Sequence, residues 1–414
     1  MTVLFVTWDG PGTSYLESLF LPILARARDP RDQLHVLQYG WGLEEYEGAI
    51  RAAASSLSVP YTLRSVWRRP VGLGTAATIA RGAADIVRYA RRHEVDVLMP
   101  RAPIAAAMAL LARRALPGVR LLYDADGLMA DERVDFAGWD PSGRGYRALR
   151  AAEGAAVRQA EAILARTEWA VGVLGERVGA DIRSKAFVVP NGRDAAQFTP
   201  GSASERAETR RVLGVPSEAP LLVYVGSLTE KYLPDRVAAF FGAATRADEE
   251  AHVVVLTPFG DLMNGLASDA GVPPERLVVR QVPHDEVAPV VAAADVGVAF
   301  VASTFSTQAV SAVKVGEYLL CGTPALVSHG FGDVEKQVDR SVGRVIDATR
   351  PDSLQEAAAW VVSDVLPQRE AYRARARARG VEQFSLERSA DQYRRAFDAV
   401  RPRRSHSGGG MGGS

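Results

Sequence analysis

The stretch that decides the fold is residues 296–328, VGVAFVASTFSTQAVSAVKVGEYLLCGTPALVS. It opens with a short apolar run, Val296–Phe300, passes through a polar turn to a segment with helical spacing from Val313, and ends in a second apolar run, Ala325–Val327. Short continuous apolar runs rich in Val and Leu are typical of strands buried on both faces, and a helix between two of them is typical of parallel strands. The stretch therefore predicts a strand–helix–strand unit of a parallel sheet.

The same pattern recurs along the whole chain of 414 residues. The other apolar runs are Val3–Val6, His35–Tyr39, Val95–Met99, Leu121–Tyr123, Ala162–Ala165 and Phe187–Val189 in the first half, and Leu221–Val225, Val253–Leu256, Leu277–Val279 and Arg344–Ile346 in the second. Helical segments separate them, for example Ser14–Ala27 and Ala76–Arg92. Because a single core stops growing near ~250–300 residues, the two groups of runs predict two domains, each an α/β doubly wound parallel sheet.

A polar stretch separates the two groups of runs. Residues Phe198–Pro216, FTPGSASERAETRRVLGVP, are rich in Pro, Gly, Ser and charge, and they follow the turn signal Pro190-Asn191-Gly192. We place the domain boundary here, with residues 1–197 in the first domain and 198–384 in the second. The Gly- and Ser-rich residues 405–414 are expected to form a flexible tail outside the fold. Ligands of open α/β sheets bind beyond the carboxyl ends of the strands, so two facing sheets predict one cleft.

Composition and charge exclude several classes of protein. The chain is 47% apolar and 24% charged, as in ordinary soluble globular proteins. Lys plus Arg and Asp plus Glu both number 49, so no global basic field favours nucleic acid as a partner. The single cysteine, Cys321, has apolar neighbours and predicts a buried residue in a reducing cytoplasm. No apolar run approaches a membrane span, and the start of the chain lacks the pattern of a signal peptide.

Glycine-containing turns follow the first strand of each half. Gly226 and Ser227 follow Leu221–Val225, and there a glycine with a small hydroxyl lets the backbone approach a phosphate at a helix start. Gly12, in Gly10-Pro11-Gly12 after the first strand of the chain, is the matching position in the first half. Neither turn has the Gly-x-Gly-x-x-Gly spacing, so NAD is not expected. Small residues also close such turns for packing reasons alone, and this alternative stays open.

The helix expected from Val313 begins with the elements of an anion site. Ser311 precedes it, and Lys314 lies in its first turn, so hydroxyl, ammonium and helix amides converge on one point. Glu317, one turn further on, is placed to accept hydrogen bonds from ribose hydroxyls. The alternative is a surface Lys314–Glu317 pair at i,i+3, which stabilises a helix by only a few tenths of a kcal/mol. Spacing alone leaves both interpretations open.

This stretch resembles the donor-site signature of the family 4 glycosyltransferases, which have the GT-B fold of two Rossmann-like domains facing across a cleft. The signature Ser-x-x-Lys-x-x-Glu-Tyr-Leu-x-x-Gly-x-Pro falls on Ser311, Lys314, Glu317, Tyr318, Leu319, Gly322 and Pro324. Three more stretches are similar to segments of the family, in the family's order: DADGLMADER (124–133), VVPNGRDAAQF (188–198) and YVGSL (224–228). The resemblance spans most of the chain.

The resemblance implies a retaining glycosyltransferase. Its co-substrate would be a nucleotide diphosphate-sugar, a UDP- or GDP-sugar, with no bound cofactor, and its acceptor a glycan, a lipid-linked glycan or a small natural product. Retention needs no protein nucleophile if the acceptor attacks the face that the leaving group departs from. The first domain would bind the acceptor, and residues 385–400 would cross back to pack on it. The alternatives are a GT-B sugar-nucleotide epimerase and a non-catalytic GT-B binding partner.

The sequence departs from the family pattern at the donor site. The first of the family's two glutamates falls on Ala309, and the usual Arg after the donor-domain glycine is Ser227. Lys231 sits one position early relative to the usual diphosphate-binding lysine. These departures predict that Lys314 and Ser311 contribute more to diphosphate binding than in typical members. Lys231 would stabilise negative charge on the leaving group beside them.

Asp126 occupies the position where many members of the family carry a His near the transferred sugar. We expect it to lie in the cleft and to orient the sugar or the acceptor. Asp124 and Asp126 together also have the spacing of a Mg²⁺ or Mn²⁺ site, but they lie in the half opposite the nucleotide half. We therefore expect no metal ligand and an activity that survives EDTA.

One basic segment raises the question of a membrane. Arg64–Arg69 places Trp67 among three arginines, and Arg113 and Arg114 add a basic pair in the same half of the chain. Such a patch suits an anionic membrane surface at the inner face, beside a lipid-linked acceptor. The alternative is a solvated surface turn.

Overall fold

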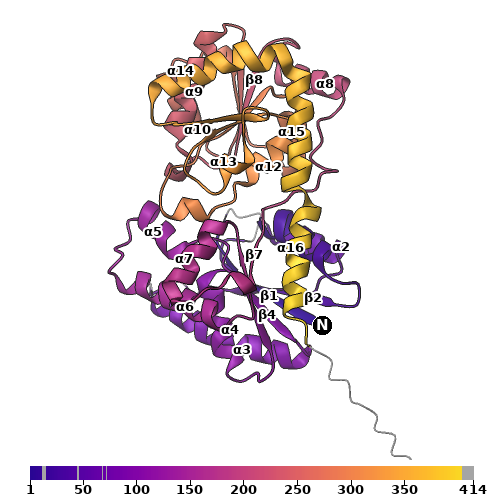
Figure 1. The fold of residues 1–414 in the computed structure, drawn as a ribbon, viewed down its shortest axis with the longest axis vertical. Helices are drawn as coiled ribbons and strands as arrows, with labels where there is room; N and C mark the ends of the chain where they lie inside the picture. The colour runs from indigo at the N-terminus through magenta and orange to yellow at the C-terminus, as the bar shows by residue number, and fades with distance from the viewer. Residues whose placement is uncertain (12–14, 44–45, 68, 71, 403–414) are drawn as a thin grey trace, which may run out of the picture.

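A computed structural model describes residues 1–11, 15–43, 46–67, 69–70 and 72–402. The chain forms two α/β units stacked along the long axis of the molecule (Figure 1). Each unit contains one parallel sheet, with strand order β3-β2-β1-β4-β5-β6-β7 in the first and β10-β9-β8-β11-β12-β13 in the second. The order reverses direction beside the first strand of each unit, as in Rossmann-like domains. The predicted fold class, GT-B, is confirmed.

The first sheet contains β1 (Thr2–Asp9), β2 (Gln33–Gly40), β3 (Tyr61–Ser65), β4 (Val97–Pro100), β5 (Arg120–Asp124), β6 (Ala162–Ala165) and β7 (Ala186–Val188). Its helices are η1 (Leu16–Phe20), α1 (Leu21–Ala27), α2 (Glu47–Ser56), α3 (Leu73–Arg92), α4 (Ala102–Arg113), α5 (Met129–Ala137), α6 (Arg144–Gln159), α7 (Glu168–Val178) and η2 (Arg183–Lys185). Every strand predicted in this half is present. The edge strand β3 is an addition that the apolar pattern did not reveal.

The second sheet contains β8 (Leu221–Val225), β9 (His252–Leu256), β10 (Leu277–Arg280), β11 (Val296–Ala299), β12 (Ala325–Ser328) and β13 (Gly343–Ile346). Its helices are α8 (Ala203–Leu213), η3 (Glu230–Tyr232), α9 (Pro234–Ala247), α10 (Gly260–Asp269), η4 (Pro274–Arg276), η5 (His284–Glu286), α11 (Val287–Ala293), η6 (Ser306–Ala309), α12 (Val313–Leu320), α13 (Val334–Gln337), α14 (Pro351–Trp360), η7 (Val361–Val365), η8 (Leu366–Gln368) and α15 (Arg369–Phe384). All strands predicted in this half are present.

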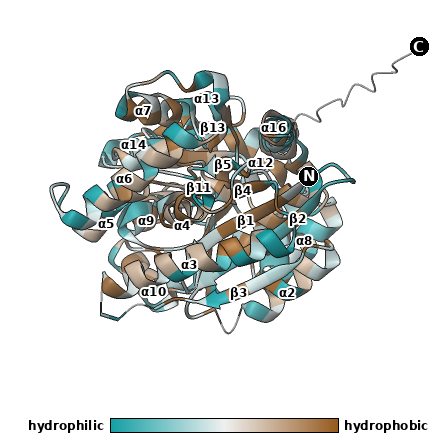
Figure 2. Ribbon diagram, turned by 90° about the horizontal axis from the view of Figure 1, so that it is seen from below, coloured by the Kyte–Doolittle hydropathy of each residue, from teal (hydrophilic) through white to brown (hydrophobic). Residues whose placement is uncertain are grey.

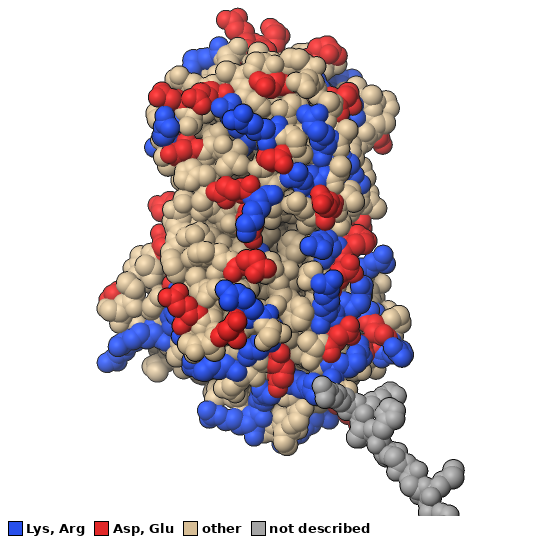
Figure 3. All heavy atoms as spheres, in the orientation of Figure 1, with Lys and Arg blue, Asp and Glu red and all other residues tan. Residues whose placement is uncertain are grey.

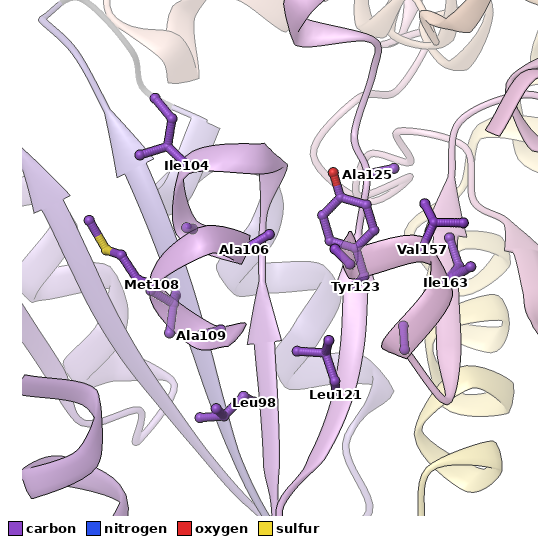
Figure 4. Packing of buried hydrophobic residues seen from close by; sticks show 14 of the residues in the cluster. Leu98, Ile104, Ala106, Met108, Ala109, Leu121, Tyr123, Ala125, Val157 and Ile163 are labelled. Atoms are coloured by element: carbon purple, nitrogen blue, oxygen red, sulfur yellow. The ribbon is translucent and has the colours of Figure 1, made fainter. Parts of the chain in front are cut away.

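Both faces of each sheet are covered, which explains the continuous apolar runs. In β1, Leu4 packs into the core beneath α3 and α4, and Phe5, one residue on, packs into the core on the opposite face beside α1. Figure 4 shows strand residues such as Leu98 and Tyr123 facing Ala109 and other small residues of α4. In Figure 2, much of β1 has the brown colour of hydrophobic residues, and the strand lies inside the layer of helices. Burying one such side chain contributes about 1.5–3 kcal/mol.

The chain crosses between the two units twice. Residues 189–202 lead from β7 to α8, and α15 continues into α16 (Leu386–Ala399), which runs down the side of the first unit (Figure 1). The two crossings pair as a short bridge between Arg193 and Ser385. Helix α15 packs on α12, whereas α16 packs on α1, β6 and β7. Residues 405–414 lie outside the described residues.

The polar stretch 198–216 is more ordered than its composition predicts. It contains helix α8, which begins with a capping box formed by Ser202 and Glu205 and ends at Gly214 in the left-handed conformation. Helix α8 packs on α11, and its Leu213 is buried in the core of the second domain. Local capping signals therefore form a helix within this polar stretch, and the domain boundary at residue 198 stays a prediction.

Candidate functional site

Segments that follow the carboxyl ends of strands meet between the two domains. Lys231, after β8, donates a hydrogen bond from Nζ to Oε1 of Glu132, after β5, at 2.9 Å. Thr167, after β6, donates from Oγ1 to the carbonyl of Gln308, after β11, at 3.0 Å. The carboxyl ends of both sheets therefore face each other, which is where open α/β sheets bind ligands.

Lys314 lies in the first turn of α12, and its ammonium is enclosed by aromatic rings. Nζ lies 4.2 Å from the ring centre of Tyr224 and 4.3 Å from that of Tyr232, and it donates a hydrogen bond to the Tyr224 hydroxyl at 3.1 Å. Burial lowers the pKa of Lys314 to about 7, an effect that the charge of Glu317 opposes. Within the described ranges no carboxylate forms an ion pair with this ammonium. The group would be stabilised by an incoming anion.

The turn after β8 lies directly beside that ammonium. Gly226 has φ +121°, and a Cβ there would lie 3.5 Å from Nζ of Lys314. The Tyr224 hydroxyl, which accepts from Lys314, donates to the carbonyl of Ser227 at 2.5 Å. The structure thus brings Gly226, Ser227 and Lys314 together. Gly12, the matching position of the first half, lies outside the described residues.

Ser311 is held by the segment that connects the two domains. Its Oγ accepts a hydrogen bond from the backbone amide of Asn191 at 3.3 Å, and its carbonyl accepts one from the Asn191 side chain at 3.0 Å. Ser311 is buried. These hydrogen bonds therefore hold the residues that precede α12 against the first crossing. A role of the Ser311 hydroxyl in binding diphosphate stays a prediction.

Glu317 does not pair with Lys314. Its Oε1 instead accepts a hydrogen bond from Nε of Arg193 at 2.8 Å, and Nη2 of the same guanidinium forms an ion pair with this oxygen at 2.8 Å. Glu317 is 5% exposed and Arg193 is 6% exposed, so this is a buried ion pair. The alternative of a surface Lys314–Glu317 pair is wrong. Sequence reasoning missed Arg193, although it stands inside the quoted stretch VVPNGRDAAQF.

Asp126 follows β5 with a left-handed backbone, φ +59°. Its carboxylate accepts from Arg101 at 2.6 Å and from Arg166 at 3.2 Å, one bond to each oxygen. Although burial favours the neutral acid, the two guanidinium charges hold the pKa of Asp126 below its usual value. Asp126 is therefore an ionised hydrogen-bond acceptor at the carboxyl end of the first sheet.

Asp124 is fully buried behind Asp126. It accepts from Arg166 at 2.8 and 3.0 Å and from the hydroxyl of Tyr393, in α16, at 3.2 Å. Burial raises the pKa of Asp124, and the charge of Arg166 opposes that effect. The carboxylates that have the spacing of a metal site are thus occupied by guanidinium groups. Arg101 and Arg166 were missed, although Arg166 directly follows the predicted strand Ala162–Ala165 and Arg101 directly follows β4 as observed.

The position of the missing family glutamate is an apolar contact between the domains. Ala309, at the end of η6, is fully buried in the core of the first domain. Nearby, the ring of Phe305 meets that of Trp169 edge-on at 4.9 Å. A carboxylate at position 309 would lose its hydration there, so alanine suits this contact.

The basic residues proposed for a membrane patch do not form one surface. Trp67 is 53% exposed at the carboxyl end of the first sheet, beside Arg81, whose guanidinium stacks on its ring at 5.5 Å. Arg113 ends α4 at the opposite edge, where it donates to two backbone carbonyls and pairs with Glu161. Arg113 is therefore wrongly assigned to a patch with Trp67. Among the helices described, none is long and apolar enough to cross a bilayer.

Solved structures with the same fold include the Anabaena protein HepE in complex with UDP and glucose, with a TM-score of 0.74 and 18% identity over 96% of this chain and 99% of HepE. The architecture is the two-domain GT-B fold. Residues 205–379 match the family model of the glycosyl transferases group 1.

Two similar relatives are described as D-inositol 3-phosphate glycosyltransferases. The one from Geodermatophilus obscurus is 30% identical over 366 residues, 83% of this chain and 77% of the relative. The one from Actinosynnema mirum is 28% identical over 336 residues, 77% of this chain and 76% of the relative. The chain belongs to the glycosyl transferases group 1, and it is a glycosyltransferase, as the resemblance implied.

Proposed function

We propose that the protein transfers a sugar from a nucleoside diphosphate to an acceptor, with retention at the anomeric carbon. The observation that carries the proposal is the ammonium of Lys314, enclosed by two tyrosine rings beside Gly226. A half-buried ammonium at the start of a helix, next to a turn without a side chain, is suited to a diphosphate.

The transfer breaks the bond between the anomeric carbon and the terminal phosphate oxygen, and the electron pair goes to that oxygen. The acceptor oxygen forms the new bond on the same face of the sugar, and its proton passes to the leaving phosphate. Because negative charge grows on the phosphate during the step, Lys314 binds the transition state more tightly than the ground state. Lys231 would add a second charge after leaving Glu132.

Asp126 serves as an acceptor of hydrogen bonds from the sugar or the acceptor molecule. Its pKa lies below the usual value, so it is ionised and cannot donate a proton near neutral pH. Arg101 and Arg166 hold both of its oxygens, which fixes the direction of the carboxylate.

Similar proteins indicate which substrates to test first. HepE was solved with UDP and glucose, which favours UDP-sugars over GDP-sugars as the first donors. The relatives' descriptions favour D-inositol 3-phosphate as the first acceptor, ahead of glycans and lipid-linked glycans.

The test is release of nucleoside diphosphate from a panel of UDP- and GDP-sugars, with and without acceptor. We expect release that depends on the acceptor and a product whose anomeric configuration, read by NMR, equals that of the donor. An isomerised sugar nucleotide without an acceptor would indicate an epimerase instead. Binding of nucleotide without turnover of any donor would indicate a non-catalytic partner, and an inverted product would contradict retention.

A further inference from the structure

Arg193 makes contacts with three parts of the molecule at once. Its Nε and Nη2 reach Oε1 of Glu317 in α12, and its Nη1 donates to the carbonyl of Ser18 in η1 of the first domain. Its backbone pairs with the second crossing, with the amide donating to Phe384 O and the carbonyl accepting from Leu386 N, both at 2.8 Å. Arg193 therefore links the candidate donor site, the first domain and the hinge.

The backbone around Arg193 is held against the second crossing. At Gly192 a Cβ would lie 2.3 Å from the carbonyl oxygen of Ser385, so the two crossings are in direct contact. With both backbone groups of Arg193 bonded to the second crossing, the point where its side chain leaves the backbone is held in place. Its plane stands 5.8 Å from the ring centre of Phe198 and is otherwise enclosed.

The contacts between Arg193 and Glu317 involve only one of the two carboxylate oxygens. In the part of the chain that the structure describes, the contacts of Arg193 with Glu317 all end on Oε1. A carboxylate that is paired through one oxygen can accept further hydrogen bonds through the other oxygen. Lysine has a single point charge and cannot reach both Glu317 and the Ser18 carbonyl in the way that a planar fork does.

We propose that Arg193 is a positioning residue for donor recognition: it fixes Glu317 so that Oε2 accepts from the ribose hydroxyls, and it ties this carboxylate to the first domain. The inference rests on the proposed function, because it takes the ligand to be a nucleoside diphosphate. Arg193 itself touches neither the ribose nor the reacting atoms.

The test compares the affinity of UDP with that of 2′,3′-dideoxy-UDP by calorimetry, for the full chain and for three variants. We expect the unmodified protein to bind UDP about tenfold or more tightly than the dideoxy analogue, as for hydrogen bonds to a charged acceptor. Glu317→Gln and Arg193→Lys should each bring this ratio close to one. Arg377→Lys is the matched control, since Arg377 donates to carbonyls of the same crossing and of α12 but to no carboxylate. It should keep the ratio of the unmodified protein.

The outcomes separate this inference from the proposed function. If Arg193→Lys keeps the ratio while Glu317→Gln loses it, Arg193 does not position the carboxylate and the inference is overturned. If Glu317→Gln also keeps the ratio, the ribose binds elsewhere. If the unmodified protein binds neither nucleotide, the proposed function itself fails. Should Arg193→Lys not fold, the pair Arg193→Gln with Glu317→Gln leaves no unpaired charge, and its ratio should equal that of Glu317→Gln alone.

Discussion

At the scale of single residues, Lys314 is the group on which the donor site depends most directly. Its ammonium lies between two tyrosine rings and beside the turn at Gly226. If it stabilises charge on the leaving phosphate, Lys314→Ala should lower kcat by about 10²–10³-fold, the range for losing one charge-stabilising donor. Steady-state rates with a saturating donor measure this. An unchanged kcat would place the leaving group elsewhere.

The same residue predicts a pH dependence. Burial lowers the pKa of Lys314 to about 7, so the ammonium of the free protein loses its proton as the pH rises through that value. A bound diphosphate favours the charged form, so donor binding should weaken above pH 7, by up to about tenfold in KM per pH unit. In Lys314→Arg the guanidinium stays charged, and the dependence should disappear. A KM that is constant between pH 6 and 9 in the unmodified protein would contradict the assignment.

Glu317 has consequences for stability as well as for binding. The spacing of the sequence predicts an exposed residue whose replacement leaves stability unchanged, but Glu317 is buried against Arg193. Glu317→Gln leaves the guanidinium without its counter-charge, so we expect a loss of about 1–3 kcal/mol in the free energy of unfolding. Urea unfolding measures it, with Glu335→Gln on the exposed α13 as the control. Equal midpoints for both variants would contradict the burial of the pair.

At the scale of elements, the sequence predicts what is buried on both faces. Strands such as β8 and β11 are continuous apolar runs because helices cover both sides of each sheet, and that pattern survives in the sequence. Strand β3 lies at the sheet edge and is only half-buried, so it carries no such run. Helix α8 was missed for the opposite reason, since its polar composition hides a capping box.

The candidate site was predictable where position alone decides it. Gly226, Lys314 and Asp126 follow strands, and the carboxyl end of a parallel sheet is where such residues gather. The ion-pair partner of Glu317 could not be predicted from the sequence. Arg193 is 124 residues away, and the pair exists only when both domains fold. Helical spacing instead suggested Lys314, the nearest residue of opposite charge.

The two crossings between the domains pack directly against each other, and this close contact requires a glycine at position 192. A Cβ at this position would meet the carbonyl oxygen of Ser385 at 2.3 Å and Oγ of Ser389 at 2.4 Å. Gly192→Ala should therefore separate the crossings and cost about 1–3 kcal/mol, as overpacking does. Thermal unfolding checks this against Gly172→Ala, where a Cβ meets nothing within 4 Å. If Gly192→Ala and Gly172→Ala both have the Tm of the unmodified protein, the crossings are not packed as closely as the structure shows.

At the scale of the whole molecule, the domains meet through polar contacts such as Lys231–Glu132 and through the apolar contact around Ala309. On the face drawn in Figure 3, basic and acidic side chains are interspersed over both domains. Lys231 and Glu132 join the domains through a half-buried pair, and ion pairs near the surface contribute about 0–1 kcal/mol. Such contacts are weak enough for a ligand between the domains to shift their relative position.

We therefore expect the domains to close on a nucleotide. A diphosphate held by Lys314 and Lys231 would take Lys231 from Glu132, and the second domain could then turn about the two crossings between the domains. Small-angle scattering should show a smaller radius of gyration with saturating UDP, and no change with uridine, which lacks the diphosphate. Glu132→Gln frees Lys231 without touching the hinge, so it should still compact with UDP. An unchanged radius in saturating UDP, with binding verified by calorimetry, would mean that the donor is held by one domain without closure.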